Sequence, residues 1–189
     1  SASKASAELL IRSYYKTYEL PVVITRGSNT FGPYQYPEKL LSLFITNAID
    51  DQPLPVYGDG MQVRDWLHVM DHCRGIDIVL HQGRVGEAYN LGGENEQHNI
   101  DVIRLMLRTL GKPESLLRRV ADRPGHDKRY ALDTAKLRAL GWAPRHDFAN
   151  ALAETVDWYV KNEWWWRKIK SGDYLTYYQQ QYGERLATS

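Results

Sequence analysis

The sequence predicts an α/β fold, because segments of helical periodicity alternate along it with short strand-like runs. The alternation begins with a helix over residues 2–18. The run PVVIT, which starts at Pro21, is apolar on both faces and therefore suits a strand buried in a parallel sheet. No glycine-rich loop of the G-x-x-G-x-x-G kind opens any predicted helix. The chain is therefore expected to hold only part of a doubly wound α/β domain.

The remaining elements follow from the same patterns. Helical spacing predicts helices over residues 39–49, 71–82, 99–110, 134–140 and 147–162, followed by an aromatic-rich helical tail. Strands are predicted in PLPVY, QVRDWLHV, EAYNLGG, LLRRV and RYALD, the first two joined by a Gly-Asp-Gly turn. The segment RGSNTFGP is predicted to be a loop at the carboxyl end of the first strand, where open α/β sheets bind ligands.

The composition argues against several classes of function. Lysine and arginine total 24 against 23 aspartate and glutamate residues, and the net charge of +1 gives no electrostatic footprint for nucleic acid or an anionic membrane. The longest apolar stretch, LLSLFITNAI, is too short to span a bilayer. The single cysteine, Cys73, is expected to be a buried hydrophobic residue in a cytoplasmic protein. The nearby histidines lack zinc-site spacing, so no metal is expected.

Several motifs occur in one order along nearly the whole chain: SASK, RGSNTFGPYQYPEKL, PLPVYGDGMQVRDWLHV, GEAYNLGG, ADRPGHDKRYALD and the tail WWWR. Together they resemble the extended short-chain dehydrogenase/reductase family of NAD-dependent epimerases and dehydratases, and within it the dTDP-glucose 4,6-dehydratases. The resemblance implies the C-terminal part of a Rossmann-like NAD-binding fold plus a smaller α/β sugar-nucleotide-binding domain. Residues 1–30 would be a remnant of the Rossmann-like domain. Residues 31–189 would be mainly substrate domain, with about 62–92 returning to the Rossmann-like sheet.

Lys4 is assigned by the resemblance to the lysine of the family's Tyr-x-x-x-Lys motif, whose tyrosine would precede Ser1. In that motif the two side chains share a helix face, and the ammonium favours the phenolate that acts as the base. The resemblance implies a catalytic role for Lys4 and contact with NAD for Lys4 and Thr30. Thr30 stands where the dehydratase pattern has asparagine, and Gly27 stands where it has cysteine. Without the resemblance, Lys4 is a surface lysine.

The resemblance also implies a set of residues that bind the sugar nucleotide. These are Asn29, Lys39, Leu40, Pro55, Tyr57, Arg64, Asn99, Arg123 and His126. Their chemistry suits a diphosphate and a base, because an arginine can contact phosphate with a fork of donors and a tyrosine ring offers stacking area.

Each assignment has a simpler alternative that the sequence leaves open. Asn29 could belong to an Asx-turn, and Lys39 could be a solvated lysine. Tyr57 could be part of the core, and Arg64 could pair at the surface with a neighbouring aspartate. Asn99 could cap the helix that follows it.

The reaction implied by the resemblance uses bound NAD. Hydride leaves C4 of the sugar for NAD, water is lost across C5 and C6, and hydride returns to C6. The product is dTDP-4-keto-6-deoxyglucose, so the net class is hydro-lyase. The alternatives are another sugar-nucleotide epimerase or decarboxylase of the family, or a stand-alone nucleotide-binding module.

The family's tyrosine, its acidic pair and its glycine-rich loop would all lie ahead of Ser1. We therefore expect the chain alone to be inactive and to bind NAD weakly or not at all, while keeping most of the nucleotide-sugar pocket. Family members pair as homodimers through the helix that bears Lys4, and this chain retains that helix's apolar stripe. The stripe consists of Ala7, Leu10, Ile11, Tyr14 and Tyr18. We expect it to be exposed and to promote dimerisation.

Overall fold

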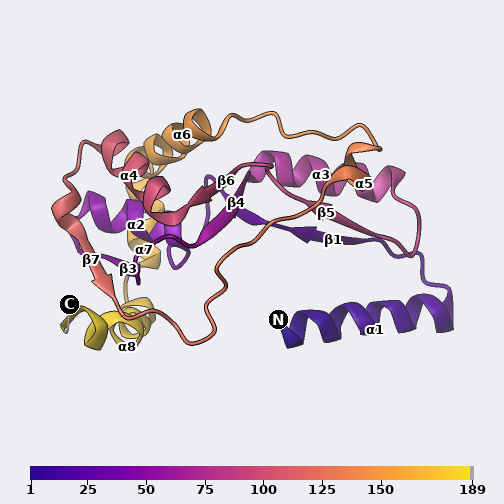
Figure 1. Ribbon diagram of the computed structural model, residues 1–189, viewed down its shortest axis with the longest axis horizontal. Helices are drawn as coiled ribbons and strands as arrows, with labels where there is room; N and C mark the ends of the chain where they lie inside the picture. Colours follow the sequence, from indigo (N-terminus) through magenta and orange to yellow (C-terminus); the bar gives the residue numbers. More distant parts are fainter. Residues whose placement is uncertain (188–189) are drawn as a thin grey trace.

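The computed structural model describes residues 1–187 and contains eight α-helices and seven β-strands within them (Figure 1). The helices are α1 (Ala2–Tyr18), α2 (Leu40–Ile49), α3 (Val69–Gln82), α4 (Asn99–Leu110), α5 (Ala135–Arg138), α6 (Phe148–Lys161), α7 (Glu163–Ile169) and α8 (Asp173–Ala187). The strands are β1 (Ile24–Gly27), β2 (Asn29–Phe31), β3 (Leu54–Tyr57), β4 (Val63–His68), β5 (Ala88–Leu91), β6 (Glu96–His98) and β7 (Leu117–Val120).

The strands form three small sheets that are mainly parallel. β1 pairs with β5, and β3 pairs with β7, both in parallel. The central strand β4 pairs in parallel with β2 and antiparallel with β6. Helices pack against these strands, as Figure 1 shows for α3 along β1 and β5. The predicted α/β fold class is therefore confirmed.

Most predicted elements are found where the sequence indicated, and two of them match to the residue: the helices over 2–18 and 99–110. The predicted strand RYALD is wrong. Arg129 makes only an isolated bridge with Val63, after which the Asn90 amide donates to the carbonyl of Asp133 and holds the chain near β5. The segment RGSNTFGP, predicted to be a loop, contains strand β2. Residues 29–31 pair with β4, and the turn-forming residues around them gave no indication of this distant pairing.

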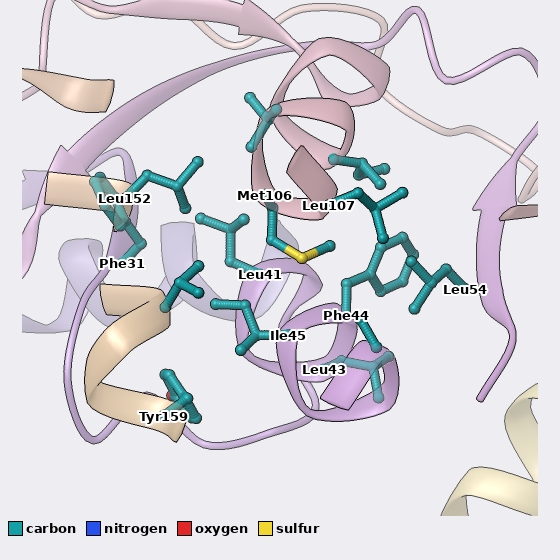
Figure 2. Packing of buried hydrophobic residues seen from close by; sticks show 14 of the residues in the cluster. Phe31, Leu41, Leu43, Phe44, Ile45, Leu54, Met106, Leu107, Leu152 and Tyr159 are labelled. Carbon is teal, nitrogen blue, oxygen red and sulfur yellow. The ribbon is translucent and has the colours of Figure 1, made fainter. Parts of the chain in front are cut away.

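The larger core is built around α2, in which every residue from Leu41 to Ala48 is buried. Such a helix is predominantly apolar, is buried on all sides and must be surrounded by other elements. Figure 2 shows Met106 and Leu107 of α4 packed against this helix, with Leu152 of α6 nearby. Each fully buried aliphatic side chain contributes about 2 kcal/mol to stability by leaving water. The helix therefore provides a rigid base for the residues at its ends.

A smaller core lies between α3, β5 and α5. Its buried members are Leu67, Val79, Tyr89, Leu91, Leu137 and Trp142. Beside it, the buried carboxylate of Asp71 accepts hydrogen bonds from the backbone N–H groups of Arg145 and His146, both at 3.0 Å. Although burial acts to raise the pKa of Asp71, these bonds hold it below its usual value.

The division of the chain into two domains near residue 30 stays a prediction.

The first helix is attached to the rest of the chain by few contacts. α1 has no buried residue, and the apolar stripe expected to be uncovered is indeed exposed, with Leu10 61% and Tyr18 70% accessible. Arg26 of β1 donates two hydrogen bonds to Glu8, at 2.8 and 2.5 Å. α1 therefore lies against β1 with its apolar face available to another surface.

Two surface features complete the comparison with the sequence. Cys73 is exposed, so the prediction that it is buried was wrong. It lies on α3, a helix whose buried face is set by Asp71, Gly75 and Val79, and position 73 points away from that face. Within residues 1–187, no helix is both long and apolar enough to cross a membrane.

The two glycines after β5 permit a close approach of two backbone segments. A Cβ atom on Gly93 would lie 1.9 Å from the carbonyl oxygen of Trp66 in β4. The buried Asp65 carboxylate accepts from the N–H groups of Gly93 and Asn95, both at 2.8 Å. β4 is thus covered by a connection that only glycine permits, and its position depends on that contact.

We expect Gly93→Ala to lower the free energy of unfolding by at least about 2 kcal/mol, because the backbone atoms it meets cannot move aside as a flexible side chain could. Chemical denaturation with the linear extrapolation method measures this loss. The control is Gly111→Ala, where no atom lies within 4 Å and only the positive φ of 65° opposes alanine. That variant should lose about 1 kcal/mol. Equal losses for the two variants would contradict the proposed clash.

Candidate functional site

A cavity with a volume of about 380 Å³ opens between the larger core and the loop that follows β7. All nine residues predicted to contact a sugar nucleotide line it. They are Asn29 from β2, Lys39 and Leu40 at the start of α2, Pro55 and Tyr57 from β3, Arg64 from β4, Asn99 at the start of α4, and Arg123 and His126 from the loop after β7. Segments up to 97 positions apart, from Asn29 to His126, thus meet at one site.

Strand pairing explains why these residues converge. β3 and β7 are parallel, and Tyr57 lies opposite Val120 at the end of both strands. The two loops that follow therefore leave the sheet at the same edge, which brings Arg123 and His126 beside Tyr57. Pro124 and Gly125, with a φ of 65°, make the tight turn between them.

Arg64 is the most deeply buried cation at this site, with only 5% of its surface accessible. Its guanidinium donates to the carbonyls of Val63 at 2.7 Å and Asp127 at 2.8 Å. It lies 4.2 Å from the centre of the Tyr130 ring. Among the described residues, no carboxylate lies within ion-pair distance of it, so the predicted alternative of a surface pair with an aspartate is not found. Burial lowers the pKa of Arg64, but a guanidinium remains charged.

His126 links Arg64 to an aspartate that the sequence analysis did not single out. The Arg64 guanidinium lies 3.1 Å from Nε2 of His126, and Nδ1 of the same ring lies 2.6 Å from Oδ1 of Asp122. Gln62 donates to the other carboxylate oxygen of Asp122 at 3.1 Å. Although desolvation acts to raise the pKa of Asp122, the bonds from His126 and the Arg123 backbone hold it below its usual value. In the sequence, the only indication that Asp122 belongs to this site is its position directly before Arg123.

Tyr57 is surrounded by cations and aromatic rings. The guanidinium groups of Arg123 and Arg185 lie 5.1 and 5.3 Å from its ring centre. Gln181 donates to its hydroxyl at 3.2 Å, and the ring of Tyr182 lies 6.4 Å away. Helix α8 thus forms one wall of the cavity. Sequence reasoning missed this contribution, because the aromatic tail is typical of ordinary packing.

Three buried polar atoms of residues that line the cavity have no hydrogen-bond partner among the described residues. They are Oε1 of Gln62, Nε1 of Trp66 and Oδ1 of Asn99. Buried polar atoms are rarely left unpaired in folded proteins, so these atoms indicate a missing partner. The alternative role of Asn99 as a helix cap is not found, because His98 is the N-cap residue and no side chain caps α4.

The start of α2 presents a more exposed part of the site. Lys39 is the N-cap residue of α2, and its ammonium pairs with Glu38 at 2.7 Å while 62% of its side chain stays accessible. Asn29 lies within strand β2, so the Asx-turn alternative is not found. The N-terminal ends of α2 and α4 both lie at the cavity, and helix N-termini favour negative charge.

The two residues predicted to contact NAD lie outside this cavity. Lys4 is exposed on the first turn of α1, one turn before Glu8, which binds Arg26 near the carboxyl end of β1. Thr30 follows β1, and its hydroxyl lies 2.7 Å from Nδ1 of His72. Both residues are therefore near the carboxyl end of β1, the edge expected for a ligand. Their roles stay predictions.

The two positions that depart from the dehydratase pattern meet at one imidazole ring. A Cβ atom on Gly27 would lie 2.6 Å from Cε1 of His72, and the same ring contacts Thr30. Burial lowers the pKa of His72, which favours the neutral ring. Glycine at position 27 thus leaves room for His72.

A second cavity, of about 320 Å³, lies between α2, α7 and α8. Lys170 lines it and donates to Oδ1 of Asn47 at 2.8 Å and to Oγ1 of Thr46 at 3.2 Å. Burial lowers the pKa of Lys170 to about 8. Because this ammonium already has protein acceptors, the cavity is a poorer anion site than the first. No cluster of three or more metal-binding side chains occurs in residues 1–187.

Comparison with known proteins identifies the family that this chain resembles over most of its length. The model of the family described as GDP-mannose 4,6 dehydratase matches residues 1–155. The dTDP-glucose 4,6-dehydratase of Xanthomonas campestris pv. campestris is 50% identical over 184 residues, which cover 92% of this chain and 52% of that protein. The chain spans about half the length of the curated relatives it matches.

Two solved structures of dTDP-glucose 4,6-dehydratases have the same fold over most of this chain. That from Bacillus anthracis str. Ames, in complex with NAD, gives a TM-score of 0.84 at 54% identity and covers 89% of this chain and 54% of its own. That from Streptomyces venezuelae, also with NAD bound, gives 0.87 at 52% identity and covers 89% and 53%. The resemblance drawn from the sequence motifs is therefore confirmed.

We expect the Lys170 ammonium to titrate with a midpoint of about pH 8, below the value of 10.5 for a free lysine, because burial disfavours its charge. NMR of the side-chain ¹³Cε resonance measures this midpoint, and Lys170→Arg identifies the signal by its loss. Between pH 8 and 10.5 the unfolded chain holds a proton that the folded chain has released. This lysine should therefore make the free energy of unfolding rise with pH across that window. A midpoint near 10.5 would contradict the burial.

Proposed function

Because this chain belongs to the GDP-mannose 4,6 dehydratase family, we propose that it supplies the sugar-nucleotide site of a dTDP-glucose 4,6-dehydratase. The observation that carries the proposal is the buried guanidinium of Arg64, which has no ion pair within the described residues and faces a cavity. A buried charge without a partner is costly, so this arrangement is best explained by an anionic ligand. A nucleoside diphosphate supplies that anion.

The surroundings of Arg64 support a diphosphate rather than a single carboxylate. Arg123, His126 and Lys39 line the same cavity, and the N-terminal ends of α2 and α4 add partial positive charge. Tyr57 offers a ring of the size that a pyrimidine base contacts. The unpartnered atoms of Gln62 and Asn99 can bond the hydroxyl or amide groups of a ligand. We assign the diphosphate to the Arg64 side and the base to the Tyr57 side.

The whole protein would use NAD, which serves as the temporary hydride acceptor when it is bound. In the whole protein the protonated ammonium of Lys4 would lie beside the catalytic tyrosine of the Tyr-x-x-x-Lys motif. Lys4 and Thr30 would both contact the cofactor. Their location near the carboxyl end of β1 supports this assignment. In this proposal residues 1–30 belong to the cofactor-binding domain, and residues 31–189 mainly to the substrate domain, with about 62–92 returning to the first.

The activity of the whole protein would be a hydro-lyase reaction, in which dTDP-glucose loses water to give dTDP-4-keto-6-deoxyglucose. The 189-residue chain alone would bind the nucleotide without turning it over, because a lysine cannot replace the tyrosine base. The second candidate is an epimerase or decarboxylase that acts on UDP-sugars, which would use the same diphosphate contacts. The base therefore discriminates between the two.

The proposal extends to assembly and location. The apolar stripe of α1 is exposed along its length, which supports a homodimer formed through this helix. A cytoplasmic location is consistent with a single cysteine whose thiol is exposed and free.

We expect the chain to bind dTDP more tightly than UDP in calorimetric titration. Arg64→Lys should weaken dTDP binding at least about tenfold, because an ammonium cannot reproduce the planar fork of donors. Arg138→Lys is the matched control, since Arg138 lies outside the cavity in an exposed pair with Glu94, and its affinity should be unchanged. Wild-type affinity in Arg64→Lys would contradict the diphosphate site. Preference for UDP would favour the second candidate.

We expect the chain to form dimers in light scattering at micromolar concentration. Leu10→Lys, in the exposed stripe of α1, should shift the equilibrium toward monomer by placing charges in the interface. Leu80→Lys is the control, because Leu80 is equally exposed (68% against 61%) but lies on α3. A monomeric wild-type chain, or equal effects of the two substitutions, would argue against dimerisation through α1.

A further inference from the structure

The contact between Arg64 and His126 fixes the protonation of the imidazole ring. A guanidinium carries only donors, so at 3.1 Å from it the Nε2 atom of His126 must act as the acceptor. Nε2 therefore holds no proton. The remaining proton lies on Nδ1, which donates to Oδ1 of Asp122 at 2.6 Å. Both hydrogen bonds can form together only if the ring is a neutral imidazole protonated at Nδ1.

A phosphate group cannot bond to that tautomer at Nε2, because phosphate oxygens and the bare Nε2 atom are both acceptors. A diphosphate that takes the Arg64 donors removes the hydrogen bond that keeps Nε2 unprotonated. Nε2 can then gain a proton and donate it to a phosphate oxygen, while Nδ1 keeps its bond to Asp122. The ring becomes an imidazolium between two anionic partners.

We propose that binding of a nucleoside diphosphate to this cavity is coupled to the uptake of a proton by His126, and that Asp122 is the positioning residue that makes this possible. The inference rests on the proposed function, because it concerns the same cavity. The step forms one N–H bond, at Nε2 of His126, and the proton comes from the solvent or from the buffer acid, which is left deprotonated. By linkage, the affinity for the ligand rises as the pH falls.

The charges that face His126 come from several elements. Arg64 reaches it from β4, the Tyr57 ring of β3 lies 5.8 Å from its ring, and Arg185 of α8 lies beside Tyr57. Its own loop adds Asp122, Arg123, Asp127 and Tyr130. The guanidinium groups oppose an imidazolium in the free chain, and only Asp122 among these residues bonds the ring as an anion. The negative charge of a bound diphosphate would outweigh the guanidinium charges and would favour the imidazolium form of His126.

The role of Asp122 explains why a carboxylate lies behind the His126 ring, next to a cavity suited to anions but not in its lining. Its oxygens accept from His126, from Gln62 and from the backbone N–H of Arg123. All of these donors belong to the protein, so the carboxylate orients the ring and the loop instead of meeting the ligand. Its charge then stabilises the imidazolium that forms on binding, as an aspartate does for the histidine of a catalytic triad.

Calorimetry of the 189-residue chain with dTDP-glucose tests the coupling. This probe is preferred to dTDP because a terminal phosphate itself titrates, with a pKa of about 6, whereas both phosphates of the sugar nucleotide stay ionised. The titration is run at pH 7.5 in two buffers of different ionisation enthalpy, such as PIPES and Tris. An ordinary histidine, with a pKa of about 6.5, is mostly neutral at that pH. We expect uptake of more than about half a proton per ligand.

Variants separate the parts of the mechanism. His126→Asn should abolish the buffer dependence while leaving residual binding through Arg64. Asp122→Asn should reduce the uptake, because the amide can still accept from Nδ1 but carries no charge to stabilise the imidazolium. Asp157→Asn, an exposed residue of α6 paired with Lys161 and remote from the cavity, is the matched control and should keep the wild-type uptake.

The outcomes distinguish the inference from the proposed function. Binding with the same heat in both buffers overturns the coupling and leaves the nucleotide site intact. Absence of binding overturns both. A readout independent of the ligand is the ¹⁵N NMR signature of His126 in the free chain at pH 7.5, where a neutral ring protonated on Nδ1 is expected. An imidazolium, or a ring protonated on Nε2, would refute the premise.

Discussion

A single buried cation, the guanidinium of Arg64, sets the conditions that the rest of the site must satisfy. Removing an ion from water costs several kcal/mol, and among residues 1–187 no carboxylate forms an ion pair with Arg64 to offset that cost. Two carbonyls, one imidazole nitrogen and one aromatic ring replace its hydration. These partners come from β4 and from the loop after β7, so the loop is held in place by the charge it solvates. Fold and site are therefore coupled through one side chain.

The larger core explains how that charge is held in a fixed position. β4 is paired on both edges, and the connection over Gly93 lies against its backbone. Helices α2 and α4 pack tightly against each other, as Figure 2 shows for Met106 and Leu41. Their N-terminal ends meet at the cavity, so the same packing that buries apolar surface also directs two helix dipoles at the ligand site. The packing of α2 against α4 thus both stabilises the fold and sets the positive potential of the helix N-termini at the cavity.

The parts of the site that the sequence predicted differ in kind from those it missed. Arg64 and Arg123 lie in motifs whose residue types already suit an anion, and local patterns place them on a strand and a stiff loop. No local sequence pattern singles out Gln62 or Asp122. Their hydrogen bond forms only because β3 and β7 pair and bring the loops that follow them together. The wall formed by α8 was missed for the same reason. Aromatic residues indicate packing, but the sequence does not state which surface they will cover.

The distribution of contacts also bears on how much of a sugar-nucleotide enzyme half its length can hold. Every residue that lines the cavity of about 380 Å³ lies between Asn29 and Tyr182, so helix α1 does not contribute to its wall. By contrast, Lys4 lies on a helix with no buried residue, attached by Arg26 and Glu8, and its surroundings are open. The cavity borders a packed core, whereas Lys4 is held only by the few contacts of α1. The proposed nucleotide site therefore lies in the packed part of the chain, whereas the proposed cofactor contact of Lys4 lies on an exposed helix.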